Sequence, residues 1–308
     1  MDFIFDEANK KAYLILNENK TNIIGKVKLR GTNIIVNIVY ISKNIPLMNT
    51  VKEAVPTQFY SLLKSNLQKQ IRRQEITAIT TASILLDLNA FELLRRLIII
   101  AAEDVEISTE TSVMTWLMMA TSKGFILSPT LKNYVLNYVE ALVKHPICRR
   151  LIINMNDYND KLQISDVMSS SISSVANKSE IAAILLRTYY GGLEGDNPML
   201  CKLCDEYLKV KRTLPSIIVK NIENKINLPK LQISDAAIDY HIYPNLLNLI
   251  NKDTQIDVTT ISRAIWICSS SINKRVNIIT NVKYDEIWQK ILPSFTFHTK
   301  EYLLKIMS

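Results

Sequence analysis

Glycine is scarce in this chain of 308 residues, which has only six, three of them between Gly191 and Gly195. Because glycine serves tight turns and positive backbone torsions, its scarcity favours a helical protein. The cluster resembles a phosphate-binding loop superficially, but it lacks the Lys-Ser/Thr ending and carries Glu194 and Asp196. We therefore interpret it as a turn between two helical blocks.

Cysteine is also infrequent, and four residues do not make the framework of a secreted disulfide scaffold. We expect an intracellular, reducing compartment, either cytoplasm or nucleus. Cys201 and Cys204 have the spacing of zinc ligands or a redox pair, but no second such pair follows at a suitable distance. The sequence thus predicts buried free thiols, no metal and no other cofactor.

Long apolar runs and signal-peptide features are missing as well. The longest uncharged apolar stretches, such as residues 113–122, fall short of the about 20 residues that span a bilayer. The first nine residues lack the basic and then apolar layout of a secretory signal. No membrane partner is expected.

Catalytic motifs are absent from the local sequence. The chain has three histidines, His145, His241 and His298, and none belongs to a nucleophile or metal motif. Asp239 and His241 form an acid-base pair only if the fold brings a nucleophile to them. We predict that the protein is not an enzyme, while an active site assembled from distant residues remains an open alternative.

What the chain does have is a large apolar fraction, 48%, and a basic excess of 37 Lys and Arg over 29 acidic residues. The apolar fraction is enough for a substantial core. The net charge of +8 and a pI near 9.1 favour a polyanionic partner such as nucleic acid.

The N-terminal region is rich in Ile and Val over residues 13–17, 23–29 and 33–41, with Gly31 between the last two segments. This pattern predicts a three-stranded antiparallel β-meander. Alternation places Lys26, Lys28 and Arg30 on one face of the second strand.

After Pro56 the apolar period becomes helical over residues 59–73, 131–142 and, less regularly, 238–250. Trp116 lies in a segment that is apolar all round and is expected in the core. We predict a mainly α fold: a multi-helix bundle with a small N-terminal sheet. The predicted divisions are 1–56, 57–175 and 176–308, the last either a separate block or continuous with the second.

Two charged clusters mark the helical region. Lys64, Lys69, Arg72 and Arg73 could contact phosphates, or they could form a solvated helix face whose basic end complements the helix dipole. A second cluster favours internal ion pairs, with Glu92 one helical turn before Arg96. Its members are Glu92, Arg95, Arg96 and Glu103.

The chain over about residues 57–144 resembles the helical region that follows the ATPase core in the replication-associated recombination protein A family. That clamp-loader-like family includes the WRN-interacting ATPases. The matching positions are Ile71-Arg72-Arg73, Arg95-Arg96-Leu97 and Ala101-Ala102-Glu103-Asp104-Val105. The family carries a P-loop upstream, whereas no Gly-Lys-Ser/Thr precedes Phe59 here. The resemblance implies a helical module of DNA replication or recombination machinery that acts by assembly or DNA contact.

Two functions follow as hypotheses. The first is a non-enzymatic helical protein that binds DNA or a DNA-processing assembly, with phosphate contacts from the basic helix end and from Lys26, Lys28 and Arg30. The second is a scaffolding protein that forms homo-oligomers through an apolar helix face, its positive charge being incidental.

Overall fold

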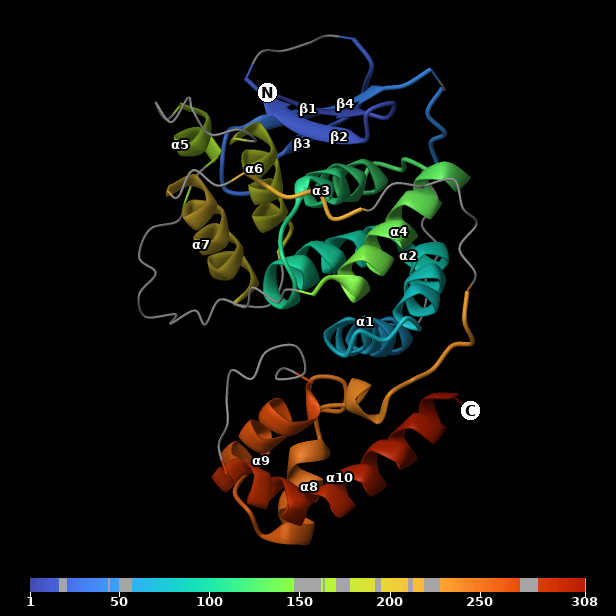
Figure 1. Ribbon diagram of the computed structural model, residues 1–308, viewed down its shortest axis with the longest axis vertical. Coiled ribbons are helices and arrows are strands. Elements are labelled where there is room, and N and C mark those ends of the chain that lie inside the picture. The colour runs from blue at the N-terminus through green and yellow to red at the C-terminus, as the bar shows by residue number, and fades with distance from the viewer. Residues whose placement is uncertain are drawn as a thin grey trace. The chain divides into compact units, whose positions relative to one another are not determined.

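The computed structural model describes residues 1–16, 21–43, 45–49, 57–146, 162, 164–169, 178–191, 195–209, 213–218, 228–271 and 282–307. The chain forms two compact units (Figure 1). Unit 1 comprises residues 1–52, 89–145 and 149–226, and unit 2 comprises residues 53–88, 146–148 and 227–308. The predicted boundary near residue 175 lies outside the described residues.

A four-stranded mixed sheet forms one layer of unit 1. Its strands are β1 (Asp2–Asp6), β2 (Lys11–Ile15), β3 (Ile23–Lys28) and β4 (Ile35–Ile41), in the order β2-β1-β4-β3. The predicted three-stranded antiparallel meander was therefore wrong in strand number and direction. Strand β1 pairs in parallel with β4, a strand that begins about 30 residues later. The other neighbour of β1 is β2, which pairs with it antiparallel across the short turn of residues 7–10.

Helices cover one face of this sheet (Figure 1). Helix α3 (Thr109–Thr121) and helix α6 (Lys178–Leu185) both pack on β2. As predicted, Trp116 is in the core: its indole is fully buried, donates to the Phe3 carbonyl at 2.9 Å and packs against Phe5. Unit 1 also contains helices α4 (Pro129–Lys144), α5 (Ile164–Ser169) and α7 (Asp196–Lys209).

Helix α2 (Ala78–Asp104) is interrupted at Asn89, whose backbone is extended. The Asn89 side chain accepts a hydrogen bond from the Glu92 amide at 3.1 Å, so it caps the second helical segment. The division between the two units falls at this residue.

Unit 2 contains α1 (Thr57–Arg72), the first segment of α2, α8 (Leu246–Thr254), α9 (Val258–Ala264) and α10 (Val282–Met307). Its main apolar cluster joins α8, α9 and α10 through residues that include Leu246, Ile261 and Ile291. The prediction of a mainly helical chain is confirmed. Among the described residues, no helix combines the length and apolarity needed to cross a bilayer.

Candidate nucleic-acid interface

The basic end of α1 lies in the interior of unit 2, which contradicts a solvent-facing patch there. Lys69 is only 6% exposed, and its ammonium donates to the Asp239 carboxylate at 2.7 Å and to the Ser65 hydroxyl at 2.9 Å. A lysine held in this way cannot also reach a phosphate without breaking a buried ion pair.

Arg72 and Arg73 are held by backbone and hydroxyl groups far away in the sequence. The buried Arg72 guanidinium donates to the Ser270 carbonyl at 3.1 Å. The half-buried Arg73 donates to the hydroxyls of Ser234 and Ser271 at 2.7 and 2.5 Å. Lys64 is half-buried and has an interaction partner within the chain. Lys69, Arg72 and Arg73 therefore connect α1 to remote segments of unit 2.

His241 joins this cluster through Asp239. The Asp239 carboxylate accepts from the His241 backbone amide at 2.9 Å and lies 3.2 Å from its Nδ1. Burial opposes ionisation of Asp239, but the His241 hydrogen bond and the Lys69 ammonium together hold its pKa well below the ordinary value. The ammonium stays paired with a carboxylate, so Lys69 is poorly suited to activate Ser65 as a nucleophile.

The second charged cluster is internal to unit 1. Glu92 pairs with Arg95 at 3.2 Å, one turn along α2. Arg187, which the sequence had not singled out, is 2% exposed and donates to the Arg95 carbonyl at 3.0 Å. Its pKa falls to about 10, first because of burial and then because Arg95 is near, while Asp196 opposes the shift. Arg187 is thus buried, whereas the predicted members of the cluster, Glu92, Arg95, Arg96 and Glu103, are half-buried.

The basic residues of the β3–β4 hairpin, in contrast, face solvent. Lys26, Lys28 and Arg30 are exposed, and none of them forms an ion pair with any described residue. Of the four strands, β3 is at one edge of the sheet, and it pairs only with β4. Lys26 and Lys28 lie on one face of β3, about 7 Å apart along the strand. The predicted common face therefore covers Lys26 and Lys28 of β3, whereas Arg30 lies beyond the end of the strand, in the turn.

The turn that carries Arg30 is fixed by its own hydrogen bonds. Leu29 is buried, and its carbonyl accepts from the Thr32 amide and hydroxyl, both at 3.1 Å. The Thr32 hydroxyl accepts from the Ile34 amide at 3.1 Å, and Gly31 has φ +76°. The charged residues at this turn are thus held on an ordered backbone.

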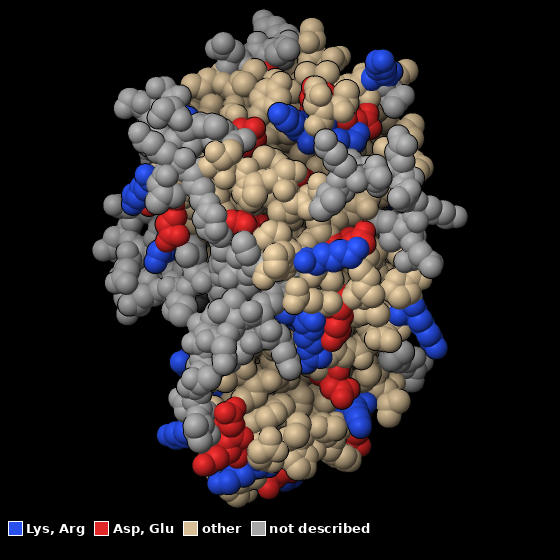
Figure 2. Space-filling model, in the orientation of Figure 1, with Lys and Arg blue, Asp and Glu red and all other residues tan. Residues whose placement is uncertain are grey.

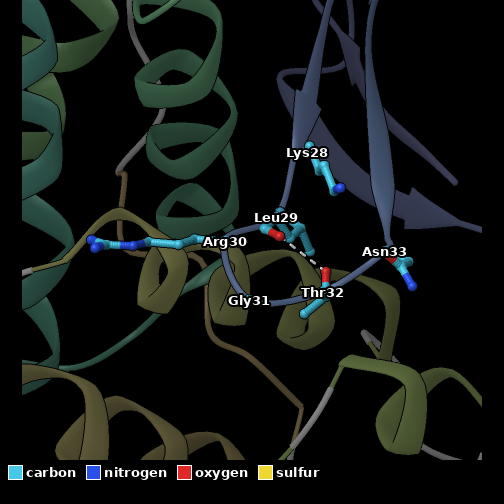
Figure 3. Close-up of a pocket in the computed structure, with 6 residues that line it drawn as sticks. All are labelled: Lys28, Leu29, Arg30, Gly31, Thr32 and Asn33. Carbon is cyan, nitrogen blue, oxygen red and sulfur yellow. Dashed lines mark hydrogen bonds between the residues drawn. The ribbon is translucent and has the colours of Figure 1, made fainter.

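An open hollow of about 520 Å³ lies at the turn and is lined by residues 28–33 (Figure 3). Arg30 extends from the turn in the direction opposite to Asn33, while Lys28 lies on the side of Asn33. The charges therefore spread over the turn and do not converge on one point. Such a spread suits an extended polyanion better than a single small anion.

Other charges near the hairpin modify its field. Lys123 is exposed, and its side chain lies over Gly25 of β3, where an added Cβ would be 3.1 Å from Lys123 Cγ. On the other side of β4, the buried Asp2 carboxylate accepts from the Asn37 amide at 2.8 Å. Figure 2 shows basic and acidic side chains interspersed on the face in view, with no broad field of one sign.

Other candidates for a functional site would be the cysteine pair of α7 and a group of metal-binding side chains. Cys201 and Cys204 are buried free thiols on α7, and burial raises the pKa of Cys204 well above its ordinary value. Among the described residues, no three His, Cys, Asp or Glu side chains are grouped so that they could hold a metal ion.

Comparison with known proteins gives no relative: no family model, no curated protein and no solved structure matches this chain. The resemblance to the replication-associated recombination protein A family therefore stays a prediction.

Proposed function

We propose that this chain is a non-enzymatic DNA-binding accessory protein whose phosphate contacts come from the β3–β4 hairpin. The supporting observation is the contrast between its two predicted basic sites. Lys69 and Arg72 are buried and bonded within unit 2, whereas Lys26, Lys28 and Arg30 are exposed on an ordered hairpin. Basic side chains of the second kind contact phosphates without reading base sequence.

The expected binding is weak and strongly dependent on salt. If the three residues of the hairpin each neutralise one phosphate of duplex DNA, the slope of log affinity against log salt is about −2.7. Raising the salt from about 50 to 200 mM then lowers the affinity roughly fortyfold. The interspersed acidic residues on the surface in view favour a local contact over a broad one.

A competing explanation for the same lysines is protection of an edge strand, since charged residues on an edge prevent strands of different molecules from pairing. That role predicts self-association of a charge-neutralised variant and no DNA binding by the natural chain. One set of variants can therefore distinguish DNA binding from edge-strand protection.

The test is fluorescence polarisation with labelled duplex and single-stranded DNA of mixed sequence. The variant is Lys26→Gln/Lys28→Gln/Arg30→Gln, and the control is Lys230→Gln/Lys252→Gln/Lys300→Gln, which removes three exposed charges from unit 2. We expect the first variant to lose most of the binding and its salt slope, and the control to keep both. No binding at low salt, or equal losses in the two variants, would refute the proposal.

A further inference from the structure

Helix α10 carries an exposed stripe that combines apolar and charged residues along its length. At about 100° per residue, six positions between Glu286 and Leu304 fall within about 40° of the direction of Phe297. All six are exposed: Glu286, Lys290, Pro293, Phe297, Glu301 and Leu304. We call these six residues the α10 stripe.

Two apolar members of the stripe, Phe297 and Leu304, are large and exposed. Phe297 is 57% and Leu304 is 71% exposed, while Ile291 and Phe295 on the opposite side of α10 are buried in the core of unit 2. The inner face of α10 therefore packs against the core of unit 2, and the α10 stripe remains exposed to solvent. Exposed apolar groups on a rigid helix favour contact with another surface.

We infer that the α10 stripe is the interface of a symmetric, antiparallel homodimer. Consider two α10 helices that pair antiparallel, with Phe297 of each copy beside Pro293 of the other. In this arrangement, any two residues that face each other have numbers that add up to about 590. Lys290 then lies within one residue of the position opposite Glu301 of the second copy. The two-fold symmetry makes this ion pair twice and buries both phenylalanines.

The charges of the stripe select this direction and this occupant. In a parallel pairing in register, Lys290 would face Lys290 and Glu301 would face Glu301, so both contacts would be repulsive. Among the described residues, neither Lys290 nor Glu301 forms an ion pair within its own chain. In an antiparallel pair, Lys290 of each copy can therefore form an ion pair with Glu301 of the other copy.

The contact is expected to be modest. A single helix pair buries less surface than a standard protein interface, which places it among weak, reversible associations. We expect a dissociation constant on the order of 10 µM. The inference does not depend on DNA binding, but a dimer would carry two β3–β4 hairpins and could bind one polyanion at two places.

The test is sedimentation velocity of the full chain without nucleic acid, from about 5 to 300 µM. Phe297→Ser should leave a monomer over most of this range. Lys290→Glu and Glu301→Lys should each raise the dissociation constant at least about tenfold, because each places like charges opposite at two sites. The double variant Lys290→Glu/Glu301→Lys should restore dimerisation, since it exchanges the charges on both helices.

Lys230→Glu is the matched control, because it reverses an exposed charge outside the α10 stripe. Circular dichroism melting confirms that every variant is folded. The inference is overturned if the natural chain stays monomeric at all concentrations, or if Phe297→Ser dimerises unchanged. It is also overturned if the double variant is no better than the single ones.

Discussion

The buried ion pair between Lys69 and Asp239 should make unit 2 respond in different ways to loss of its two partners. In Asp239→Ala, the Lys69 ammonium keeps the Ser65 hydroxyl at 2.9 Å but loses its buried carboxylate partner. An uncompensated buried charge of this kind costs about 3–5 kcal/mol of unfolding free energy. In Lys69→Met, the Asp239 carboxylate keeps two contacts with His241, at 2.9 and 3.2 Å. We expect that variant to lose only about 1–3 kcal/mol.

The double variant Lys69→Met/Asp239→Ala provides the decisive comparison. It contains neither buried charge, so it should be more stable than Asp239→Ala alone, with a loss of about 2 kcal/mol. Urea unfolding followed by circular dichroism and tryptophan fluorescence measures all three values. Lys230→Met, at an exposed position, is the control and should change stability by less than about 0.5 kcal/mol.

The pH dependence of the same pair has a definite sign. Because the pKa of Asp239 is lowered in the folded state, its contribution is complete above the unfolded value of about 3.9. The contribution is lost as the pH falls below that value and the carboxylate is protonated. Asp239→Ala should therefore lose less stability than the natural chain between about pH 5 and pH 2. This account of the ion pair would be refuted if the double variant were less stable than Asp239→Ala. The structural role of Lys69 would be refuted if Lys69→Met kept the natural stability but no longer bound DNA.

Two further changes test how unit 1 is held together. Glu110 accepts hydrogen bonds from residues within segment 213–218, and Glu110→Ala should lower the unfolding free energy by about 1–3 kcal/mol and speed proteolysis of that segment; cleavage at the natural rate would contradict this role. Gly124 has φ +91°, and a Cβ there would lie 2.2 Å from the Asn49 carbonyl oxygen, so Gly124→Ala should lower the melting temperature clearly. Gly31→Ala, which has a positive φ but no close neighbour, should cost only about 1 kcal/mol, and equal losses in the two variants would contradict the steric argument.

Helix positions were predictable because their signal is local. The apolar periods over residues 59–73 and 131–142 correspond to α1 and α4, and the core position of Trp116 followed from its apolar neighbours. Strand β1 was missed although β2 follows it directly, because the turn between them, residues 7–10, contains neither glycine nor proline and so gives a weak hairpin signal. Its parallel pairing with β4, which begins about 30 residues later, leaves no local signal.

The environment of α1 shows where periodicity alone misleads. Gln68 and Arg72 lie opposite the apolar face, a pattern typical of a solvated side, yet they are 4% and 7% exposed. Segments containing Gln232 and Ser270 supply acceptors for the polar side chains of α1 and its C-terminal end. A helix can therefore be buried on both faces when its polar side is matched by backbone carbonyls, and its sequence does not reveal that match.

The two basic clusters differ in how far away in the sequence the residues lie that determine their exposure. The hydrogen bonds that shape the Lys28–Asn33 turn join residues two to five positions apart, as between Thr32 and Leu29. The groups that bury Lys69 and Arg72 lie 170 and 198 positions away. Exposure of a charge in a short hairpin depends mainly on nearby residues, whereas exposure of a charge on a bundle helix depends on which remote segments pack against it. A basic patch inferred from sequence is thus better founded on a hairpin than on a helix of this protein.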